Sequence, residues 1–310
     1  MQLISAILPV LLISILGYCL VRFRFIPAEG SAALSKLTFS ILIPCLLFRG
    51  VTEAKLSNIF YFEFLAAYFI PVAIVFVAAA IIGRVVFSYG ALQQSMFSIG
   101  ASYSNATILS IPVCLYALGE KSLVPLSIIV TFHNFVLFTL GIFSAERGAL
   151  SLANVFAHLR RILISFFSNP ITMSLIAGVL VNALKIPVPK VLLDAIGFLS
   201  EAAVPMAFLI LGSSISGYGV RGQLAPVAFI VLIKLLLLPY LVWFFAFDVF
   251  SLDLLWAKTA VAIAAAPVGI ATYAFSQRYN SGESLLASSI IISTVLSVFS
   301  ISFWLKWIGA

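Results

Sequence analysis

Long uninterrupted runs of apolar residues constrain this chain more than any other feature of its sequence. Residues 3–21, LISAILPVLLISILGYCLV, carry no charged side chain, and similar runs recur along all 310 residues. A helix needs about 20 apolar residues to cross the hydrocarbon core of a bilayer. Strands of a membrane barrel alternate apolar and polar residues, which these runs do not. The sequence therefore predicts an all-α integral membrane protein.

The composition and length predict about ten transmembrane helices. Charged residues make up 9% of the chain, against about 25% in an ordinary soluble domain. We place the spans near 2–22, 31–49, 61–86, 92–118, 122–145, 166–184, 190–215, 223–247, 254–277 and 284–307. The one substantial polar connection is residues 146–165, which we predict to be a cytoplasmic linker. It separates a first five-helix repeat, 1–145, from a second, 166–310.

The basic residues predict an orientation rather than a nucleic-acid partner. The formal net charge of +7 is scattered among the connections, without a basic run. With the N-terminus outside, the inside connections carry eight arginines and the outside ones carry six basic residues. Cytoplasmic loops favour Lys and Arg, so we expect both termini outside the cell, in a bacterial inner membrane.

The two halves share motifs in the same order, which predicts inverted repeats. FSILIPCLLFRG in the second span corresponds to SEAAVPMAFLILG in the seventh, and FIPVAIV in the third to LLPYLVW in the eighth. GEKSLVPLSIIV and GESLLASSIII follow the fourth and ninth spans. Five spans per half place the repeats in opposite orientations. Many secondary transporters have this plan, with the substrate where broken helices meet near the midplane.

Two spans contain the interruptions that such a site needs. The candidate binding residues are Ser104, Asn105, Ala106, Thr107 and Pro112 in the fourth span, and Pro267, Val268 and Gly269 in the ninth. Proline removes an amide donor and kinks or breaks a helix. Facing half-helix N-termini with free amides, for example around Ala106 and Val268, suit a carboxylate. Ordinary proline kinks in packed helices are the alternative for either span taken alone.

Four further polar residues lie within apolar spans. Asn134 is a candidate substrate contact, or an interhelical hydrogen-bond partner. His133 could relay protons or form a structural hydrogen bond. Glu201 and Lys234 could form a structural ion pair, and Glu201 could instead carry a coupling proton. We find no catalytic set, metal-ligand spacing or cofactor motif, so we predict no enzyme activity and no cofactor.

The sequence resembles the auxin efflux carrier family of transporters, in its bacterial branch. Four stretches carry the resemblance: SNATILSIPVCLYALGE, SNPITMSLIAGVLVNALKIPVP, AAVPMAFLILGSSI and AIAAAPVGIATYAFSQRYNSGESLLASSIIISTVLS. They lie in the family's order and cover essentially the whole chain. Ser104 stands where plant members have proline before the crossing asparagine, and Val268 stands where they have a polar residue.

The resemblance implies two inverted five-helix repeats and an elevator mechanism. Spans 1, 2, 6 and 7 would form a scaffold that dimerises, and spans 3–5 and 8–10 would form a moving transport domain. Asn105 and Pro267 would take the positions of the family's crossing asparagine and crossing proline. The family's substrates are organic anions, namely auxin in plants and malate, malonate and similar acids in bacteria. Protons or sodium could drive the cycle.

Two other functions remain open at this stage. The ten-span bile acid/sodium symporters share this plan, but they place polar sodium ligands, often carboxylates, around the two crossings. Neither crossing of this chain contains an acidic residue. A non-transporting membrane sensor would use the linker 146–165 as its signalling surface, although that segment has no recognisable partner motif.

Overall fold

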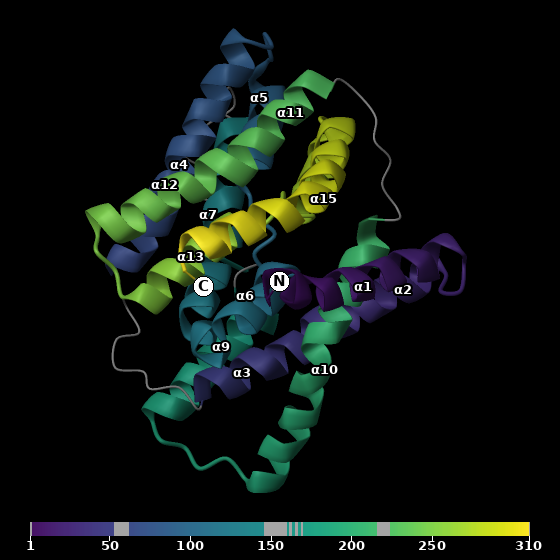
Figure 1. Cartoon of the computed structure of the whole chain (residues 1–310), viewed down its shortest axis with the longest axis vertical. Helices are drawn as coiled ribbons and strands as arrows, with labels where there is room; N and C mark the ends of the chain where they lie inside the picture. Colours follow the sequence, from purple (N-terminus) through teal and green to yellow (C-terminus); the bar gives the residue numbers. More distant parts are fainter. Residues whose placement is uncertain are drawn as a thin grey trace. The chain divides into compact units, whose positions relative to one another are not determined.

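The computed structural model describes residues 2–52, 62–145, 160, 163–164, 167–168, 170–215 and 224–309. Within these residues every regular element is helical, apart from one isolated β-bridge (Figure 1). The prediction of an all-α chain is therefore confirmed for the described part. Most of the predicted linker, 146–165, lies outside the described residues.

Six helices of the described chain are long and apolar enough to cross a membrane. They are Glu29–Thr52, Phe62–Val85, Glu120–Ala145, Lys190–Ser213, Leu224–Val249 and Glu283–Trp307. Three shorter apolar helices are Leu12–Arg22, Pro170–Ala183 and Leu254–Ala264. The integral-membrane class is thus confirmed, while the count of ten spans in two inverted repeats stays a prediction.

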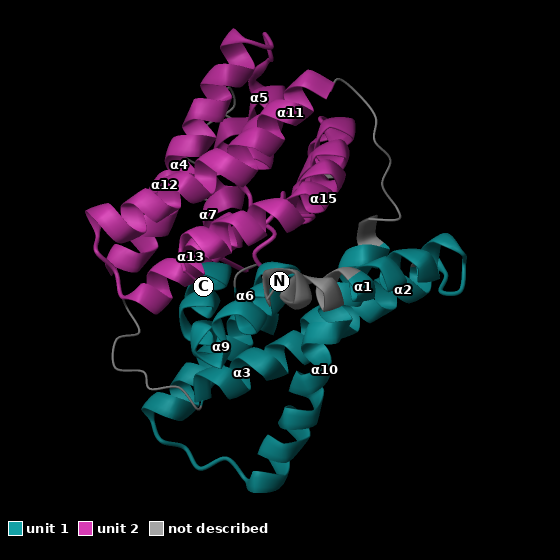
Figure 2. Cartoon of the chain, viewed as in Figure 1, with its two compact units in different colours: residues 1–61, 107–131, 165–217 teal, residues 62–106, 132–164, 218–310 magenta. Residues whose placement is uncertain are grey.

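The chain divides into two compact units (Figure 2). Unit 1 comprises residues 1–61, 107–131 and 165–217, and unit 2 comprises residues 62–106, 132–164 and 218–310. Both units are therefore assembled from three separate stretches of sequence, and the long helix α7 (Leu123–Ala145) contributes to each.

In unit 1, small residues allow helices to approach closely. The unit contains α1 (Gln2–Arg22), α2 (Ala28–Leu37), the π-helix η1 (Thr38–Leu42), α3 (Ile43–Thr52), α6 (Ser110–Leu118), the 3₁₀-helix η2 (Glu120–Ser122), α9 (Pro170–Ala183) and α10 (Lys190–Ile215). Helix α1 packs on α10, and α3 packs on α9 and α10. At Gly17 and Gly212 the backbones of α1 and α10 come so close that neither position has room for a Cβ atom. Close backbone contact of this kind is a common way of packing helices in membranes.

Unit 2 contains the crossing residues of both helix interruptions around which the candidate site is built, up to Ala106 in the first. Its elements are α4 (Phe62–Val85), α5 (Ala91–Ser102), the second part of α7, α11 (Leu224–Leu232), the π-helix η3 (Ile233–Leu237), α12 (Leu238–Phe244), the π-helix η4 (Phe245–Val249), α13 (Leu254–Ala264), α14 (Ala271–Tyr279) and α15 (Glu283–Trp307). Helix α4 packs on α5, α11 packs on α15, and α12 packs on α13.

The π-helix η3 is explained by the proline that follows it. Pro239 has no amide hydrogen, and its ring would clash with the carbonyl of Leu235 in a regular α-helix. The wider turn relieves this clash and turns the Leu235 carbonyl toward α15. There it accepts hydrogen bonds from Ser300 Oγ at 2.8 Å and Trp304 Nε1 at 2.9 Å. The same π-helix contains Lys234.

Candidate transport site

The fourth predicted span is interrupted in the middle of its polar sequence. Helix α5 ends at Ser102, and Tyr103 already has an extended backbone with φ −84° and ψ 109°. The next helix, α6, begins at Ser110. Residues 103–109 are therefore not helical, although most of them are buried. Buried backbone of this kind needs hydrogen-bond partners from elsewhere in the protein.

The ninth predicted span is interrupted at its proline. Helix α13 ends at Ala264, and α14 begins at Ala271. Pro267 lies between them, because it can neither donate to the preceding turn nor follow it without a clash. The predicted interruptions at Asn105 and at Pro267 are thus both present as breaks between two helices.

The two interruptions cross each other as an isolated antiparallel β-bridge between Ser104 and Val268. The amide of Asn105 donates to the carbonyl of Pro267 at 2.8 Å, and the amide of Gly269 donates to the carbonyl of Tyr103 at 3.0 Å. Each break therefore supplies the hydrogen-bond partners that the other lost when its helix stopped. All these residues belong to unit 2.

The close approach at the bridge depends on glycine. A Cβ atom at position 269 would lie 2.5 Å from the Tyr103 ring and 3.0 Å from the carbonyl oxygen of Ser104. Atoms this close would force the two strands of the bridge apart. Gly269 was predicted as a site residue because it lies near Pro267. The structure shows that a larger side chain does not fit at this position.

His133 holds the Ser104 side of the bridge from helix α7. Its Nε2 lies 3.1 Å from the carbonyl oxygen of Ser104, and its Nδ1 lies 3.3 Å from the Tyr68 hydroxyl. A carbonyl can only accept, so Nε2 carries a hydrogen. The Tyr68 hydroxyl also lies 3.4 Å from Ser104 Oγ, and His133 itself is buried. The histidine therefore ties α4, α7 and the bridge together.

Asn134 contacts Tyr103, which precedes Ser104 in the break of the fourth span. The hydroxyl of Tyr103 donates to Asn134 Oδ1, and the ring of Tyr103 lies edge-on to His133 with centroids 4.8 Å apart. Asn134 is half-buried, whereas Asn105 is buried with 4% of its surface exposed. Asn105, His133 and Asn134 thus belong to one polar cluster around the bridge, which we call the crossing cluster, together with Tyr68, Tyr103 and Ser104.

Lys234 reaches the ninth-span side of the crossing. Its Nζ donates to the carbonyl oxygens of Ala264 and Ala266, each at 2.6 Å. Ala264 is the last residue of α13, and Ala266 precedes Pro267, so both carbonyls lie where the helix no longer supplies amide donors. Lys234 therefore caps the carboxyl end of the half-helix α13.

Sequence reasoning missed three members of this arrangement. Tyr68 has the appearance of an ordinary aromatic residue of an apolar span, and Tyr103 was given no role although it lies in the polar centre of the fourth span. Ser293 of α15 donates nothing to the bridge but accepts from the Val268 amide at 3.0 Å. The sequence signal that could have revealed Ser293 is the regular spacing of serines at 289, 293, 297 and 300, all of which are buried in the structure. Such a spacing marks a polar helix face turned inward.

The two amides expected to meet a carboxylate already donate within the protein. The Val268 amide donates to Ser293, and the Ala106 amide donates to the Ser104 carbonyl at 2.7 Å. Side chains of the crossing cluster, rather than these amides, are therefore the groups to consider for an anion.

Three other predicted residues lie in unit 1. Thr107 follows the bridge in the turn before α6, and Pro112 lies in the first turn of α6. A proline in a first turn interrupts no helical hydrogen bond, because that turn's amides have no partner in the helix. Glu201 lies on α10 with an exposed side chain. Among the described residues, no group of three or more His, Cys, Asp or Glu side chains is placed to hold a metal ion.

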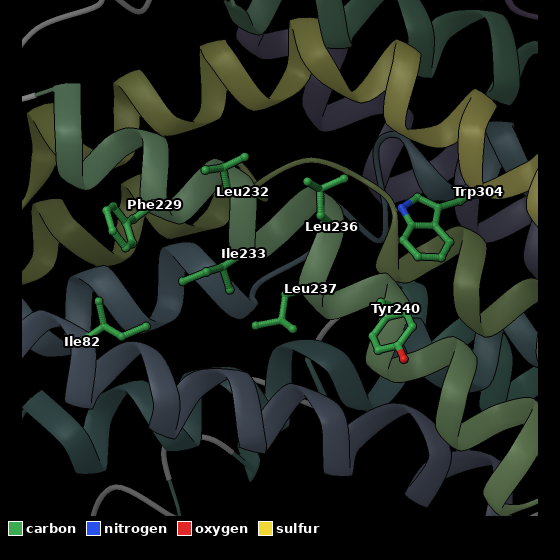
Figure 3. A pocket seen from close by; sticks show the side chains of 8 residues that line it. All are labelled: Ile82, Phe229, Leu232, Ile233, Leu236, Leu237, Tyr240 and Trp304. Atoms are coloured by element: carbon green, nitrogen blue, oxygen red, sulfur yellow. The ribbon is translucent and has the colours of Figure 1, made fainter.

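A separate apolar pocket of unit 2 does not suit an anion. It has a volume of about 570 Å³ and is lined by Ile82, Phe229, Leu232, Ile233, Leu236, Leu237, Tyr240 and Trp304 (Figure 3). The only polar atoms on these side chains are the Tyr240 hydroxyl and the Trp304 indole nitrogen, which already donates to Leu235. A carboxylate would lose its hydration there without gaining partners.

Comparison with known proteins extends over nearly the whole chain. A family model described as membrane transport protein matches residues 2–305. The chain is 25% identical over 303 residues to a Rhizobium meliloti (strain 1021) protein named "Putative malonate transporter", covering 97% of this chain and 94% of that protein. It is 24% identical over 314 residues to an "Uncharacterized transporter" of Methanothermobacter thermautotrophicus, covering 97% and 96%. Because the family model spans almost every residue, the chain belongs to the membrane transport protein family, that of the auxin efflux carriers, as its sequence predicted.

Proposed function

We propose that this membrane transporter carries a small organic anion, a carboxylate such as malonate or malate, by alternating access. The observation that carries the proposal is the bridge between Ser104 and Val268, where the breaks of two interrupted spans cross. Interrupted helices at corresponding places in two halves of a chain are where secondary transporters bind their substrates. The name of the Rhizobium meliloti relative supports a dicarboxylate.

In this proposal the substrate's carboxylate binds beside the crossing cluster. Asn105 and Asn134 supply side-chain amides, which can donate to a carboxylate oxygen. Ser104, Thr107 and Gly269 shape the surroundings, Pro267 keeps the ninth span interrupted, and Pro112 lies in the first turn of the helix that follows the fourth-span break. The amides of Ala106 and Val268 contribute as fixed dipoles through the bonds that they already make.

An elevator movement is the form of alternating access that we favour. The predicted scaffold spans 1, 2, 6 and 7 fall in unit 1, together with residues 107–131. The remainder of spans 3–5 and spans 8–10 fall in unit 2 with the crossing. This division supports a moving transport domain and a fixed scaffold, which we expect to form the homodimer. We further propose that the protein lies in the bacterial inner membrane with both termini outside.

Flux through reconstituted liposomes tests this proposal. Labelled malonate, malate and indole-acetate would be supplied to the purified protein, each with and without a proton or sodium gradient. Saturable flux of a carboxylate is expected, and it should be lost in Asn105→Ala. The matched control is Gln93→Ala, which removes an exposed amide from the same helix that leads into the crossing.

The outcomes separate the parts of the proposal. Lost flux in Asn105→Ala with normal flux in Gln93→Ala supports the crossing as the binding site, and the gradient dependence identifies the coupling ion. Unchanged flux in a folded Asn105→Ala variant would show that the site lies elsewhere. If the wild-type protein is folded and inserted yet moves no carboxylate, the substrate is not an organic anion.

A further inference from the structure

Lys234 is an unusual residue for the interior of a membrane protein. Its side chain is completely buried, and among the residues that the structure describes it is the only Lys, Arg, Asp or Glu in the buried set. Burying a charge without a partner of opposite sign is strongly unfavourable, and such residues within a membrane usually serve a pathway or a pair. The position of Lys234 therefore needs a compensating interaction.

The compensation within unit 2 is partial. The ammonium donates to the carbonyls of Ala264 and Ala266, at the negative end of the α13 dipole. A helix end carries only about half an elementary charge. The buried set of the described residues contains no Asp or Glu that could supply the rest. A protonated Lys234 would therefore leave excess positive charge at the crossing when no substrate is bound.

This charge lies directly against the crossing. Ala266, which accepts from Lys234, is bonded to Pro267, and the Pro267 carbonyl accepts from the Asn105 amide at 2.8 Å. The Lys234 ammonium thus donates to the backbone two residues before Val268, which forms the bridge. A carboxylate beside Asn105 would supply the missing negative charge in a region from which water is largely excluded, where charges interact strongly.

We propose that Lys234 is the residue that makes the crossing selective for anions, by providing a fixed positive charge behind the ninth-span break. The inference rests on the proposed function and adds its charge selectivity. Lys234 acts through the carbonyls of Ala264 and Ala266 and through its field, so it is a specificity-determining residue that positions the break. It explains how a site lined by amides and hydroxyls distinguishes a carboxylate from a neutral amide of the same shape.

A series of inhibitors that differ only in charge tests the proposal. Malonate, malonamic acid and malonamide have nearly the same shape and carry two, one and no carboxyl groups. Each compound would compete with labelled malonate for transport. If the wild-type protein transports another carboxylate, that labelled carboxylate and its own amides replace the malonate series. In the wild type, each lost carboxyl group should weaken inhibition, by about tenfold for the charge that faces the site.

The variants Lys234→Gln and Lys234→Met separate charge from structure. Glutamine keeps amide donors for the two carbonyls and removes the charge, whereas methionine removes both. We expect Lys234→Gln to raise the KM for malonate about tenfold. The three compounds should then inhibit transport by this variant almost equally. Lys234→Met should show the same loss of discrimination with a lower thermal unfolding temperature. Lys234→Arg, which keeps the charge, should keep the discrimination.

Contrary results are equally clear. If Lys234→Gln keeps the wild-type ratio of inhibition constants, the lysine is structural and the proposal is overturned. If the neutral variants do not fold, the wild-type protein still decides, because equal inhibition by the three compounds would overturn the proposal. Carboxylate flux in the wild type without charge discrimination refutes this inference alone. Absence of any carboxylate flux refutes the proposed function.

Discussion

The amide of Gly269 donates to the carbonyl of Tyr103 at 3.0 Å, in a contact so close that a side chain on Gly269 would strike the Tyr103 ring. This pair joins the two interrupted helices. Because each break lacks helical partners, the hydrogen bonds across the bridge are what satisfy the buried backbone on both sides. The geometry of the crossing therefore depends on having no side chain at this position.

Gly269→Ala should disrupt the crossing. A methyl group 2.5 Å from the Tyr103 ring must push the ring or the backbone aside, and overpacking of this kind costs about 1–3 kcal/mol. We expect a lower unfolding temperature in detergent and strongly reduced flux in liposomes. Gly90→Ala is the control, since nothing lies within 4 Å of an added Cβ there. Wild-type flux in a folded Gly269→Ala protein would contradict the role of this contact.

Ser300 and Trp304 should act together on the Leu235 carbonyl. Both donate to it, and Pro239 cannot. Removing one donor leaves the other, so Ser300→Ala or Trp304→Phe alone should lose little from this bond. The double variant leaves a buried carbonyl unsatisfied and should cost about 1–3 kcal/mol beyond the sum of the single effects. A double-mutant cycle of unfolding free energies measures this difference.

The control for that cycle is Ser302→Ala on the same helix. Ser302 Oγ donates to Val298 within α15 and does not reach the π-helix η3. Combined with Trp304→Phe, it should give additive effects. Additivity in the Ser300 cycle as well would mean that the Leu235 carbonyl does not depend on these two donors.

The positions of the helices and of both interruptions could be predicted from the sequence, because these features are local. Apolar runs define the helices, and Pro267 and Gly269 interrupt the ninth span through their own backbone chemistry. Ser104 and Asn105 could be assigned to an interruption because polar residues are unfavourable facing lipid. The family could also be recognised, because its motifs extend along the entire chain.

The partners that complete the crossing could not be predicted, because they are distant in sequence. Lys234 meets carbonyls 30 and 32 residues away, and no pattern in the sequence specifies which ones. Charge alone suggested Glu201 as its partner, whereas Lys234 donates to these two carbonyls and the Glu201 side chain is exposed. Pro112 offers a different lesson. It looked like a helix breaker, yet the break lies before it, where hydrogen bonds to the ninth span replace those of a helix.

His133 should serve as a hydrogen-bond donor rather than as a proton carrier. Its Nε2–H meets the Ser104 carbonyl, and a glutamine can place an amide hydrogen similarly. We expect His133→Gln to keep flux and its dependence on a proton gradient between about pH 5 and 8. His133→Leu should lose flux and about 1–3 kcal/mol of stability, because both the Ser104 carbonyl and Tyr68 lose a partner.

The gradient dependence decides between the two roles of His133. If His133→Gln transports but no longer responds to a proton gradient that drives the wild type, the histidine carries the coupling proton. If the glutamine variant is as damaged as the leucine variant, the donor bond alone does not explain the residue. Thermal unfolding of all three proteins shows whether reduced flux reflects reduced stability.

Gly17 and Gly212 should be needed for the contact between α1 and α10 in unit 1. A Cβ at Gly17 would overlap the carbonyl of Leu209, and one at Gly212 would overlap the carbonyl of Ser14. Backbone atoms cannot move aside as a side-chain tip can, so the helices must separate along this contact. We expect Gly17→Ala and Gly212→Ala each to lower the unfolding temperature, at a cost of about 1–3 kcal/mol or more.

Gly197→Ala is the matched control on α10 for this prediction. The nearest atom to an added Cβ there is Nη1 of Arg49 at 3.1 Å, the far end of a flexible side chain that can shift. Alanine also favours a helix over glycine by about 1 kcal/mol, so this variant should be neutral or slightly more stable. The double variant Gly17→Ala/Gly212→Ala should cost less than the sum of the single changes, because helices separated by the first methyl group have room for the second. Fully additive costs, or no cost in either single variant, would show that α1 and α10 are not held at this close separation in the membrane.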